Sequence, residues 1–442
     1  MQAKVLVVGG GGREHAIAAR LHNTGSEIFA VMRNRNPGIT RISSAYLICP
    51  ENELEKICEF GKKNHVDFAV CGPEEPLVHG LADVLGGAGI PCVGPGKAGA
   101  QIEGSKFFAR ELMRKHSIPG LVDYVVAGDV SDAMRAFDKF GDKFVIKPIG
   151  LTGGKGVKIM GEQLATRADA IAYVNEIIEK GIGQHREMLI EEKVEGEEFT
   201  LQAFVNEKSI AFAPLVQDHK RLYEGDTGPN TGGMGSYSCS DFMLPFITKE
   251  DHELAMEIMR RTVEALANDG IVYRGFLYGQ FMATADGVRV IEFNCRLGDP
   301  EAMNVLSIHD DDFTELCFKI AHGERFSETG FRKEATVCKY VVPEGYGTKM
   351  VSQSEIRVNE EAITGNGCRV YYAMVNEENG VLMTTTSRAL AIVGCEKDIE
   401  SAERHVEHAL NFVKGRFYVR HDIGKKELIQ KRILHMQKIR GS

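Results

Sequence analysis

The sequence is informative first through what it lacks. It has no run of 18 apolar residues, no signal peptide with a basic start and a cleavage site, and no lipidation motif. These absences argue against a membrane-spanning helix, a secretory route and a lipid anchor. We therefore expect a soluble, cytoplasmic protein.

The ten cysteines are scattered along the chain, and no two of them form a CxxC pair. Such spacing argues against a zinc cluster and a disulfide scaffold, and it indicates reduced, mostly buried thiols. The formal net charge of −9 at pH 7 argues against a nucleic-acid-binding surface, but it leaves room for local basic patches that bind anionic ligands.

Residues 1–103 of this 442-residue chain alternate short apolar runs with amphipathic helices. A length of about 150 residues per domain suggests about three domains in all. We expect strands at "KVLVVG", "EIFAVM", "AYLIC", "DFAVCG" and "IPCVGP", with helices between them. This alternation predicts a doubly wound, mostly parallel sheet, whose ligands bind beyond the carboxyl ends of the strands.

The first strand ends in four glycines, within "VVGGGGREHA". A dinucleotide fingerprint would need a third glycine where Glu14 stands, and an acid near the end of the second strand, where the chain has Arg33 and Arg35. A nicotinamide site is therefore disfavoured. The backbone N–H groups of Gly10–Gly12, with Arg13, could instead hold a single phosphate, and the alternative is a tight turn without a ligand.

A second turn of the same sheet carries two acids. "CGPEEPLVHG" ends another strand, and Glu74 and Glu75 follow its Gly-Pro turn. Because the carboxyl ends of parallel strands share one edge, these carboxylates could line the same crevice. They would then bind ligand hydroxyls, or they would merely start the next helix.

Beyond a helix predicted at about 96–116, the pattern changes to antiparallel strands with long loops. "KFVIKPIGLTGGKGVKIM" at 143–160 reads as two strands joined by a glycine-rich flap. The flap does not match the P-loop pattern, but it could close over nucleotide phosphates with Lys147 and Lys155 near them. Glycine hairpins also occur for purely steric reasons.

"MLIEEKVEGEEFTLQAFV" at 188–205 reads as a strand, an acidic connection and another strand. An apolar slot with exposed backbone next to Glu198 would suit adenosine, with the carboxylate on the ribose hydroxyls. A solvated acidic turn is the alternative, and composition alone favours it.

"GFLYGQFMATADGVRVIEFNCRLGDPE" at 275–301 reads as two apolar strands joined by a tight turn. Glu292, Asn294 and Arg296 recur at period 2 and should face one side, while Ile291, Phe293 and Cys295 should face a core. The carboxylate and amide oxygens suit magnesium shared with phosphates, and Arg296 could neutralise a phosphoryl group or a carboxylate. The alternative is a solvent-facing polar edge.

The segment "VQDHKRLYEGDTGPNTGGMGSYS" at 216–238 is too polar and glycine-rich to predict a strand or a helix. Loops of this length are usually functional or disordered. Its charged residues and its glycines fit a binding loop.

Several of these motifs follow one another in a specific order. "GGGGREHA", "GPEEPLV", "EGSKFF", "VQDHKR", "DTGPNTGGMG", "GFLYG" and "VIEFNCRLGDPE" are followed by "YVRHDIG" near the end. In this order and spacing they resemble the glycinamide ribonucleotide synthetase family of the ATP-grasp superfamily. The resemblance implies an N-terminal α/β substrate-phosphate domain (1–103), a two-lobed ATP-grasp domain (104–327, with a small flap lobe at about 120–194) and a C-terminal mixed α+β domain (328–442).

The resemblance also implies an ATP-dependent carbon–nitrogen ligase of purine biosynthesis. Enzymes of this family phosphorylate the glycine carboxylate, and the amine of 5-phosphoribosylamine then attacks glycyl phosphate to give glycinamide ribonucleotide, ADP and phosphate. The expected partners are glycine, 5-phosphoribosylamine and ATP as co-substrate, with Mg²⁺ or Mn²⁺ as cofactor. We expect a monomer that binds neither nucleic acid nor a membrane.

The resemblance implies roles at matching positions of this chain. ATP would be bound by Lys106, Lys147, Gly153, Gly154, Lys155, Gly156, Glu191, Glu192, Lys193, Val194 and Glu198. The substrates would be bound by Gly10, Gly11, Gly12, Arg13, Glu74, Arg221, Asp226, Asn230 and Arg296. The metal would be held by Glu292 and Asn294, and the catalytic residues would be Arg221, Asn294 and Arg296.

Two other functions stay open at this point. Another ATP-grasp carboxylate–amine ligase or a carboxylase would share the flap and the Glu292 strand, but it is not expected to carry "QDHKR" with "GPNTGGMG". A non-catalytic nucleotide-binding protein would tolerate loss of Glu292, Asn294 or Arg296, and the sequence retains all three.

Overall fold

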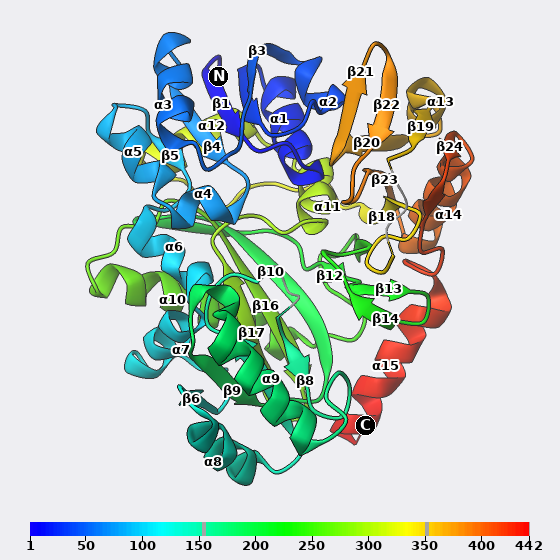
Figure 1. Ribbon diagram of the computed structural model, residues 1–442. Coiled ribbons are helices and arrows are strands. Elements are labelled where there is room, and N and C mark those ends of the chain that lie inside the picture. Colours follow the sequence, from blue (N-terminus) through cyan, green and yellow to red (C-terminus); the bar gives the residue numbers. More distant parts are fainter. Residues whose placement is uncertain (153–155, 350–352, 442) are drawn as a thin grey trace.

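A computed structural model describes residues 1–152, 156–349 and 353–441 (Figure 1). The N-terminal sheet lies at the top of Figure 1, two further sheets lie below it, and the C-terminal part lies on the right. No helix in the described residues is both long and apolar enough to cross a membrane.

The N-terminal part is the doubly wound parallel sheet that the sequence predicts. Its strands run in the order β3-β2-β1-β4-β5, and every neighbouring pair is parallel. The strands are β1 (Lys4–Val8), β2 (Glu27–Met32), β3 (Ser43–Ile48), β4 (Phe68–Cys71) and β5 (Cys92–Val93). The helices are α1 (Gly12–Asn23), α2 (Pro37–Thr40), α3 (Leu54–Lys63), α4 (Glu74–Val78) and α5 (Leu81–Gly87). Because β1 and β4 are buried on both faces, they contain near-continuous apolar runs.

The helix predicted at 96–116 is two helices, α6 (Lys97–Gly104) and α7 (Lys106–Lys115). Ser105 separates them in an extended conformation, and its Oγ accepts a hydrogen bond from Phe108 N at 3.2 Å. This N-cap starts a new helix direction. It places Lys106 in the first turn of α7.

Two antiparallel sheets follow. The small lobe has the order β6-β9-β7-β8, and the large lobe has the order β11-β10-β16-β17. The small lobe contains β6 (Tyr124–Ala127), α8 (Val130–Phe140), β7 (Phe144–Pro148), β8 (Lys158–Ile159), α9 (Arg167–Lys180), the short 3₁₀ helix η1 (Ile182–Gln184) and β9 (Met188–Glu192). The large lobe contains β10 (Glu197–Asn206), β11 (Ser209–Phe212), α10 (Lys249–Asn268), β16 (Gly275–Thr284) and β17 (Gly287–Asn294).

The alternation expected along β17 fails at one residue. Gln280 of β16 pairs with Glu292, whereas Phe281 pairs with Val290, so Ile291 is the extra residue of a β-bulge. Ile291 therefore lines a cavity, and the prediction that it faces the core is wrong. Phe293 is buried in the core, as the pattern predicts.

The segment 216–238, predicted to lack regular structure, contains four short strands. They are β12 (Gln217–Asp218), β13 (Arg221–Tyr223), β14 (Thr227–Asn230) and β15 (Gly235–Ser238). β13 and β14 form a hairpin, while β15 pairs with β12 and with β18 of the C-terminal part. The prediction was wrong because these short strands carry no apolar pattern and are stabilised by their pairing, which for β15 involves β18, about 100 positions further along the chain.

The C-terminal part is mixed α+β, as predicted. One sheet has the order β12-β15-β18-β23-β20 with β25 on β18, and a second has the order β21-β22-β19-β24. Its strands are β18 (Ala335–Pro343), β19 (Glu355–Val358), β20 (Cys368–Tyr372), β21 (Val375–Glu378), β22 (Val381–Thr384), β23 (Leu390–Glu396), β24 (Val413–Gly415) and β25 (Phe417–Tyr418). The helices α11 (Glu301–Ile308) and α12 (Phe313–His322) precede it, and α13 (Glu360–Gly365), α14 (Ile399–Leu410) and α15 (Lys426–Arg440) belong to it.

Candidate active site

A cavity of about 1030 Å³ lies where the three parts of the chain meet. Arg13 and Glu74 reach it from the N-terminal sheet, Lys147 and Ile159 from the small lobe, and Arg388 from the C-terminal part. Ligand sites of enzymes commonly lie between domains and often have this size. The cavity is therefore the candidate active site.

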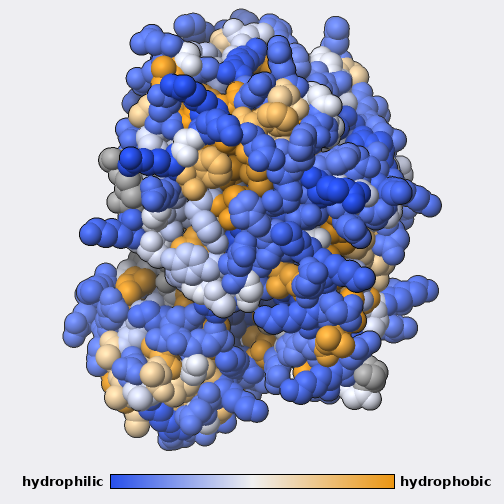
Figure 2. Space-filling model, turned by 90° about the vertical axis from the view of Figure 1, so that its right-hand side faces the viewer, coloured by the Kyte–Doolittle hydropathy of each residue, from blue (hydrophilic) through white to orange (hydrophobic). Residues whose placement is uncertain are grey.

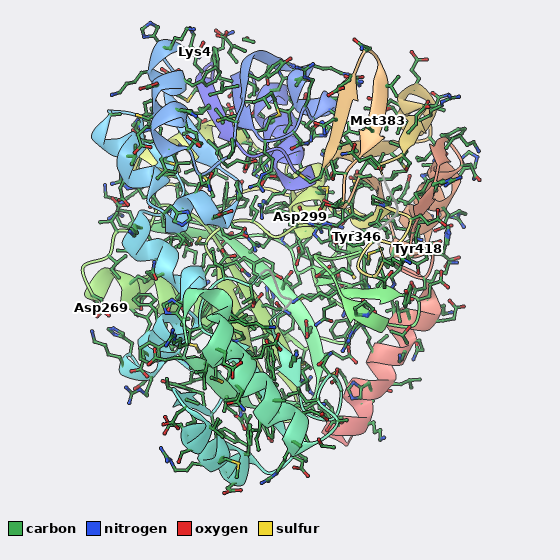
Figure 3. All side chains as sticks on the ribbon, in the orientation of Figure 1. Lys4, Asp269, Asp299, Tyr346, Met383 and Tyr418 are labelled. Atoms are coloured by element: carbon green, nitrogen blue, oxygen red, sulfur yellow. The ribbon has the colours of Figure 1, made fainter. Side chains whose placement is uncertain are left out.

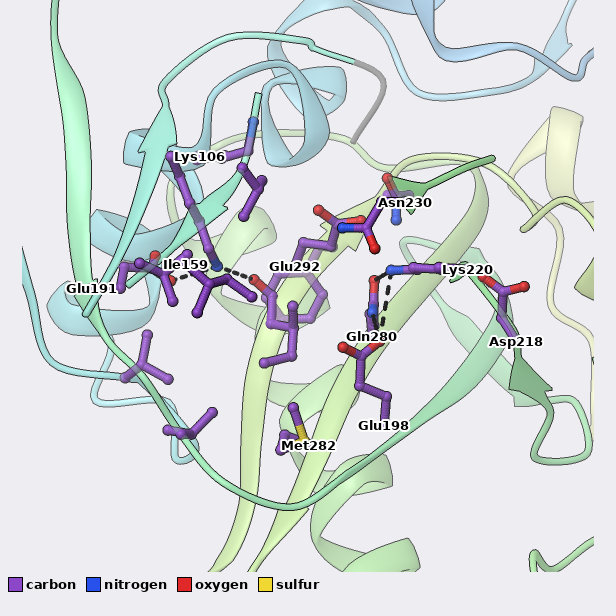
Figure 4. Close-up of a pocket in the computed structure, with 18 of the residues that line it drawn as sticks. Lys106, Ile159, Glu191, Glu198, Asp218, Lys220, Asn230, Gln280, Met282 and Glu292 are labelled. Carbon is purple, nitrogen blue, oxygen red and sulfur yellow. Dashed lines mark hydrogen bonds and ion pairs between the residues drawn. The ribbon is translucent and has the colours of Figure 1, made fainter. Parts of the chain in front are cut away.

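An acidic side chain of β17 lies among three lysines of this cavity. Figure 4 shows Glu292 with Lys106 on one side and Lys220 on the other. Burial would raise the pKa of Glu292, but Lys220, Lys106 and Lys147 outweigh it and lower that pKa. The carboxylate is therefore ionised and faces a strongly positive surrounding, which suits polyanionic ligands.

Glu292 and Asn294 fit a shared metal rather than a closed metal site. In the part of the chain that the structure describes, no group of three or more His, Cys, Asp or Glu side chains is placed to hold a metal ion. The two side chains line the same cavity and offer a carboxylate and an amide oxygen. Mg²⁺ prefers oxygen ligands and usually takes one or two from the protein and others from phosphates and water.

Two of the lysines are held in place by their surroundings. Lys106 lies in the first turn of α7, where the helix dipole disfavours a cation. Its Nζ nevertheless has a partner, since it donates to Gly150 O at 2.9 Å. Lys147 Nζ lies 2.6 Å from Glu191 Oε2, and Arg110 binds the same carboxylate at 2.7 and 3.2 Å. Burial would raise the pKa of Glu191, but Arg110 and Lys147 lower it to about 2. The Glu191 side chain thus orients Lys147 and is not free for a ligand.

Arg296 is oriented by two acids from other elements. It donates to Glu103 Oε1 at 2.9 Å, to Glu74 Oε2 at 3.3 Å and to Asn294 Oδ1 at 3.3 Å. Glu103 Oε2 also accepts from the backbone N–H of Cys295 at 2.8 Å. Burial raises the pKa of Glu103 to about 7. Glu103, which we did not identify from the sequence, therefore fixes both the side chain of Arg296 and the backbone before it.

Two further acids line the cavity and were not assigned a role from the sequence. They are Glu301, which is buried, and Asp218, which is half-buried. Burial, together with the charge of Glu301, raises the pKa of Asp218 well above its usual range, and burial also raises the pKa of Glu301. Tyr278 Oη donates to Glu301 at 2.8 Å, whereas Asp218 Oδ1 is buried without a partner among the described residues. Asp218 lies in the motif "VQDHKR", and Glu301 ends the motif "VIEFNCRLGDPE". Their place in these motifs was the sequence signal that could have identified them as site residues.

The β13–β14 hairpin brings Arg221 and Asn230 to the cavity as a paired position. Arg221 Nη2 lies 2.6 Å from Glu162 Oε2 of the small lobe. Asp226, in the turn of the hairpin, instead serves internal partners: Arg420 at 2.9 Å and Arg432 at 2.7 Å. Its carboxylate is already bound on both oxygens, although the residue lines the cavity.

The glycine loop after β1 closes on itself. Gly11 N donates to Glu14 Oε2 at 2.8 Å, and Arg13 Nε donates to Glu14 Oε1 at 2.6 Å. A Cβ atom on Gly12 would fall 2.5 Å from Tyr340 Oη, so glycine is required there for close packing. Tyr340 Oη donates to Asp299, which Figure 3 shows near the centre of the molecule. The loop thus lies at the junction with the C-terminal part.

Most predicted site residues line the one cavity. Those that do are Arg13, Glu74, Lys106, Lys147, Glu191, Glu192, Lys193, Val194, Glu198, Arg221, Asp226, Asn230, Glu292, Asn294 and Arg296. Gly10, Gly11, Gly12 and Gly156 are not among its lining residues. Gly153, Gly154 and Lys155 lie outside the described residues.

Comparison with known proteins gives consistent matches along the chain. Three family models of phosphoribosylglycinamide synthetase match in order: the N domain at residues 3–103, the ATP-grasp (A) domain at 104–302 and the C domain at 336–426. A phosphoribosylamine–glycine ligase of Methanothermobacter thermautotrophicus is 49% identical over 438 residues, which cover 99% of this chain and 100% of that protein.

Solved structures match as well. The crystal structure of phosphoribosylamine–glycine ligase from Thermotoga maritima has a TM-score of 0.81 at 27% identity, and the match covers 96% of this chain and 100% of that one. The biotin carboxylase domain of a 2-oxoglutarate carboxylase from Hydrogenobacter thermophilus has a TM-score of 0.72 at 17% identity, and the match covers 99% and 94% of the two chains. The second likeness is one of fold alone.

Proposed function

This chain belongs to the phosphoribosylglycinamide synthetase family, and from that premise we propose that it joins glycine to 5-phosphoribosylamine at the expense of ATP. The products would be glycinamide ribonucleotide, ADP and phosphate. One observation of the structure carries the proposal. An ionised carboxylate among three lysines shares a single cavity with the acids Asp218 and Glu301, so a polyanion and a cationic group can meet there.

The nucleotide would lie between the two lobes. Lys106 and Lys147 offer ammonium groups to its phosphates, and the apolar side chains of Ile159, Met282 and Ile291 line the space for its base. Glu198 would accept the ribose hydroxyls. ATP and a divalent metal are what ATP-grasp ligases use, and Glu292 with Asn294 would hold Mg²⁺, with Mn²⁺ as a substitute. When bound, the ion would neutralise phosphate charge during phosphoryl transfer.

Glycine would lie next to the acid pair. Its ammonium group matches Asp218 and Glu301, which form no ion pair with another described residue; the nearby Lys220 pairs with Glu198 instead. Its carboxylate would then point toward Arg296, which is held rigidly by Glu103 and Glu74. This placement leaves the carboxylate facing the γ-phosphate.

The chemistry needs positioning more than an enzyme nucleophile. A carboxylate is a poor acyl donor, so transfer of the γ-phosphoryl group to it creates a good leaving group. The amine of 5-phosphoribosylamine would attack the carbonyl carbon of glycyl phosphate and expel phosphate. Arg13 and the N-terminal end of α1 would face the sugar phosphate, and Glu74 would face its hydroxyls. Closure of the small lobe would keep water from the acyl phosphate.

The carboxylase alternative is distinguished by its substrate. We expect purified protein to form ADP from MgATP only when glycine and freshly generated 5-phosphoribosylamine are both present. The measurement is coupled ADP release, with mass-spectrometric detection of glycinamide ribonucleotide as the second readout. ADP formation with bicarbonate and no glycine would contradict the proposal.

The metal can be tested in the same assay. We expect activity to disappear after treatment with a chelator. It should return when Mg²⁺ is added, and Mn²⁺ should also restore it. Full activity of the metal-free protein would contradict the proposal that Glu292 and Asn294 hold a metal ion needed for the reaction.

A further inference from the structure

The last helix of the chain, α15, runs from the C-terminal part down the side of the large lobe (Figure 1). It packs against β10 and β16. Only two of its 15 residues, Leu428 and Met436, are buried, and Figure 2 shows this side of the molecule as largely hydrophilic. The partly buried Ile429, Ile433 and Ile439 add apolar packing, and polar contacts hold the rest of the helix surface that faces the large lobe.

One of these contacts joins two separate edges of the cavity. Arg432 binds Glu197 through Nη1 and Asp226 through Nη2, the latter at 2.7 Å. The side chains of Arg432 and Glu197 are only 14% and 11% exposed. His435, one turn further along α15, lies with Nδ1 2.6 Å from Glu197 Oε1. A single guanidinium thus bridges two largely desolvated carboxylates.

The two carboxylates belong to segments that the proposed reaction uses. Glu197 starts β10 and directly precedes Glu198, the residue expected to meet the ribose. Glu198 is held in turn by Gln280, whose Nε2 donates to it at 2.5 Å. Asp226 lies in the turn of the β13–β14 hairpin, which carries Arg221.

Without Arg432, these segments would lose their link. Asp226 keeps Arg420 and His219 as partners, and Glu197 keeps His435, but none of these groups spans both carboxylates. Two desolvated carboxylates that share one cation repel each other once the cation is removed. The start of β10 and the hairpin turn are then expected to separate.

We propose that Arg432 is a positioning residue of the active site, which sets the nucleotide-binding edge of β10 against the β13–β14 hairpin. The inference rests on the proposed function for the identity of the nucleotide site. It predicts that Arg432 acts on nucleotide affinity without touching the reacting atoms. The effect should therefore appear in binding and in KM for ATP more than in kcat.

The test compares two arginines of the same helix. Arg440 is also an anchor of α15, with Nη2 2.9 Å from Asp251 and two donors on Thr284 O at 3.1 Å, but neither partner lines the cavity. Arg432→Met should weaken binding of a non-hydrolysable ATP analogue with Mg²⁺ by about tenfold or more in calorimetry, which corresponds to about 1.4 kcal/mol. Arg440→Met should leave that affinity within about twofold while lowering the thermal midpoint.

A conservative variant completes the design. Arg432→Lys keeps the charge but cannot donate to both carboxylates in the fork geometry of a guanidinium, so its affinity should fall between wild type and Arg432→Met. If Arg432→Met does not fold, Arg432→Lys decides alone. The proposal would be overturned if Arg432→Lys and a folded Arg432→Met both bound the analogue with wild-type affinity. It would also be overturned if the Arg432 and Arg440 variants lost affinity equally.

Binding of the analogue is measured without turnover, so the two proposals fail separately. If the protein binds the nucleotide but does not ligate glycine, the proposed function fails and the role of Arg432 is still decided by the affinities. If ligation occurs and the Arg432 variants bind nucleotide normally, only the positioning role fails.

Discussion

At the residue scale, Asp218 has an ionisation that a bound cation should change. Burial and the charge of Glu301 raise the pKa of Asp218 well above its usual range. The acid pair is therefore expected to keep a proton in the empty cavity. An ammonium group placed beside the pair would lower that pKa, because it stabilises the ionised carboxylate.

We therefore expect glycine binding to release a proton. The release should be largest at pH values between the pKa of the complex and that of the empty site, and should vanish above the higher of the two, where the carboxylate is already ionised. The measurement is calorimetric titration of glycine in buffers of different ionisation enthalpy. Asp218→Asn should abolish the release and weaken glycine binding by at least about tenfold. A release that persists in Asp218→Asn would contradict the assignment.

The sequence predicted the residues of this cavity better than their contacts. Period 2 along a strand was enough to pair Glu292 with Asn294, because that spacing is local. The bulge at Ile291 and the binding of Asp226 to two arginines of the last 25 residues were not predictable in the same way. The bulge depends on the register of the neighbouring strand, and the contacts of Asp226 depend on arginines far along the chain. The residues around Ile291 or Asp226 alone do not predict either.

At the scale of elements, the small lobe and the hairpin are joined across the cavity. Glu162, in the turn after β8, binds Arg221 of β13 at 2.6 Å and Lys193 at 3.1 Å. The side chains are about one third exposed, so the pair is expected to contribute well under about 1 kcal/mol to folding. Because the pair joins the small lobe to the hairpin across the cavity, we expect it to favour the arrangement in which the small lobe closes over the cavity.

Glu162→Gln tests that role. We expect the thermal midpoint to change by less than about 2 °C, because a partly exposed ion pair contributes little to stability. We expect KM for ATP to rise by about two- to fivefold, since the open arrangement would become more populated. Lys180→Gln removes a more exposed ion pair that lies wholly within α9 and serves as the control. An unchanged KM in Glu162→Gln would show that closure does not need this pair.

Elements with a local apolar period were predicted well, and those without one were not. The strands of the N-terminal sheet and both strands of the Glu292 hairpin follow from apolar runs and tight turns. The strands within 217–238 have no apolar run, since β14 is "TGPN" and β15 begins with a glycine. β13 and β14 pair with each other, and β12 pairs with β15, which in turn pairs with the remote β18.

At the scale of the whole molecule, buried neutral histidines lie where different parts of the chain meet. Burial lowers the pKa values of His15, His219 and His309 to about 4. His15 accepts a hydrogen bond from Tyr372 N of the C-terminal part at 2.8 Å. His309 packs against the rings of Phe313 and Phe331. Each of these histidines is neutral in the fold at pH values where the unfolded chain binds a proton.

The buried histidines make the stability of the fold depend on pH. A histidine with a lowered pKa stabilises the fold fully above about pH 6.5, the unfolded value, and that stability is lost as the pH falls toward about 4. Buried acids with raised pKa values act in the opposite direction, because the fold then binds the proton; Glu103, with a pKa of about 7, is one. The pH dependence of the unfolding free energy of the wild-type protein is therefore the difference between these two contributions. The contribution of one histidine must be measured by substituting that histidine.

His309→Gln isolates one histidine far from the proposed reaction. Its Nε2 lies 2.7 Å from Thr329 Oγ1, a contact that a glutamine amide can keep, so the variant should fold. Between pH 6 and pH 5 the unfolding free energy of wild type should fall relative to that of the variant by about 1 kcal/mol, close to one proton taken up on unfolding. Because the chain has no tryptophan, urea unfolding is best followed by far-UV circular dichroism. Parallel pH profiles for the two proteins would mean that His309 titrates normally in the fold, and the burial of this junction would then have to be less complete than the structure indicates.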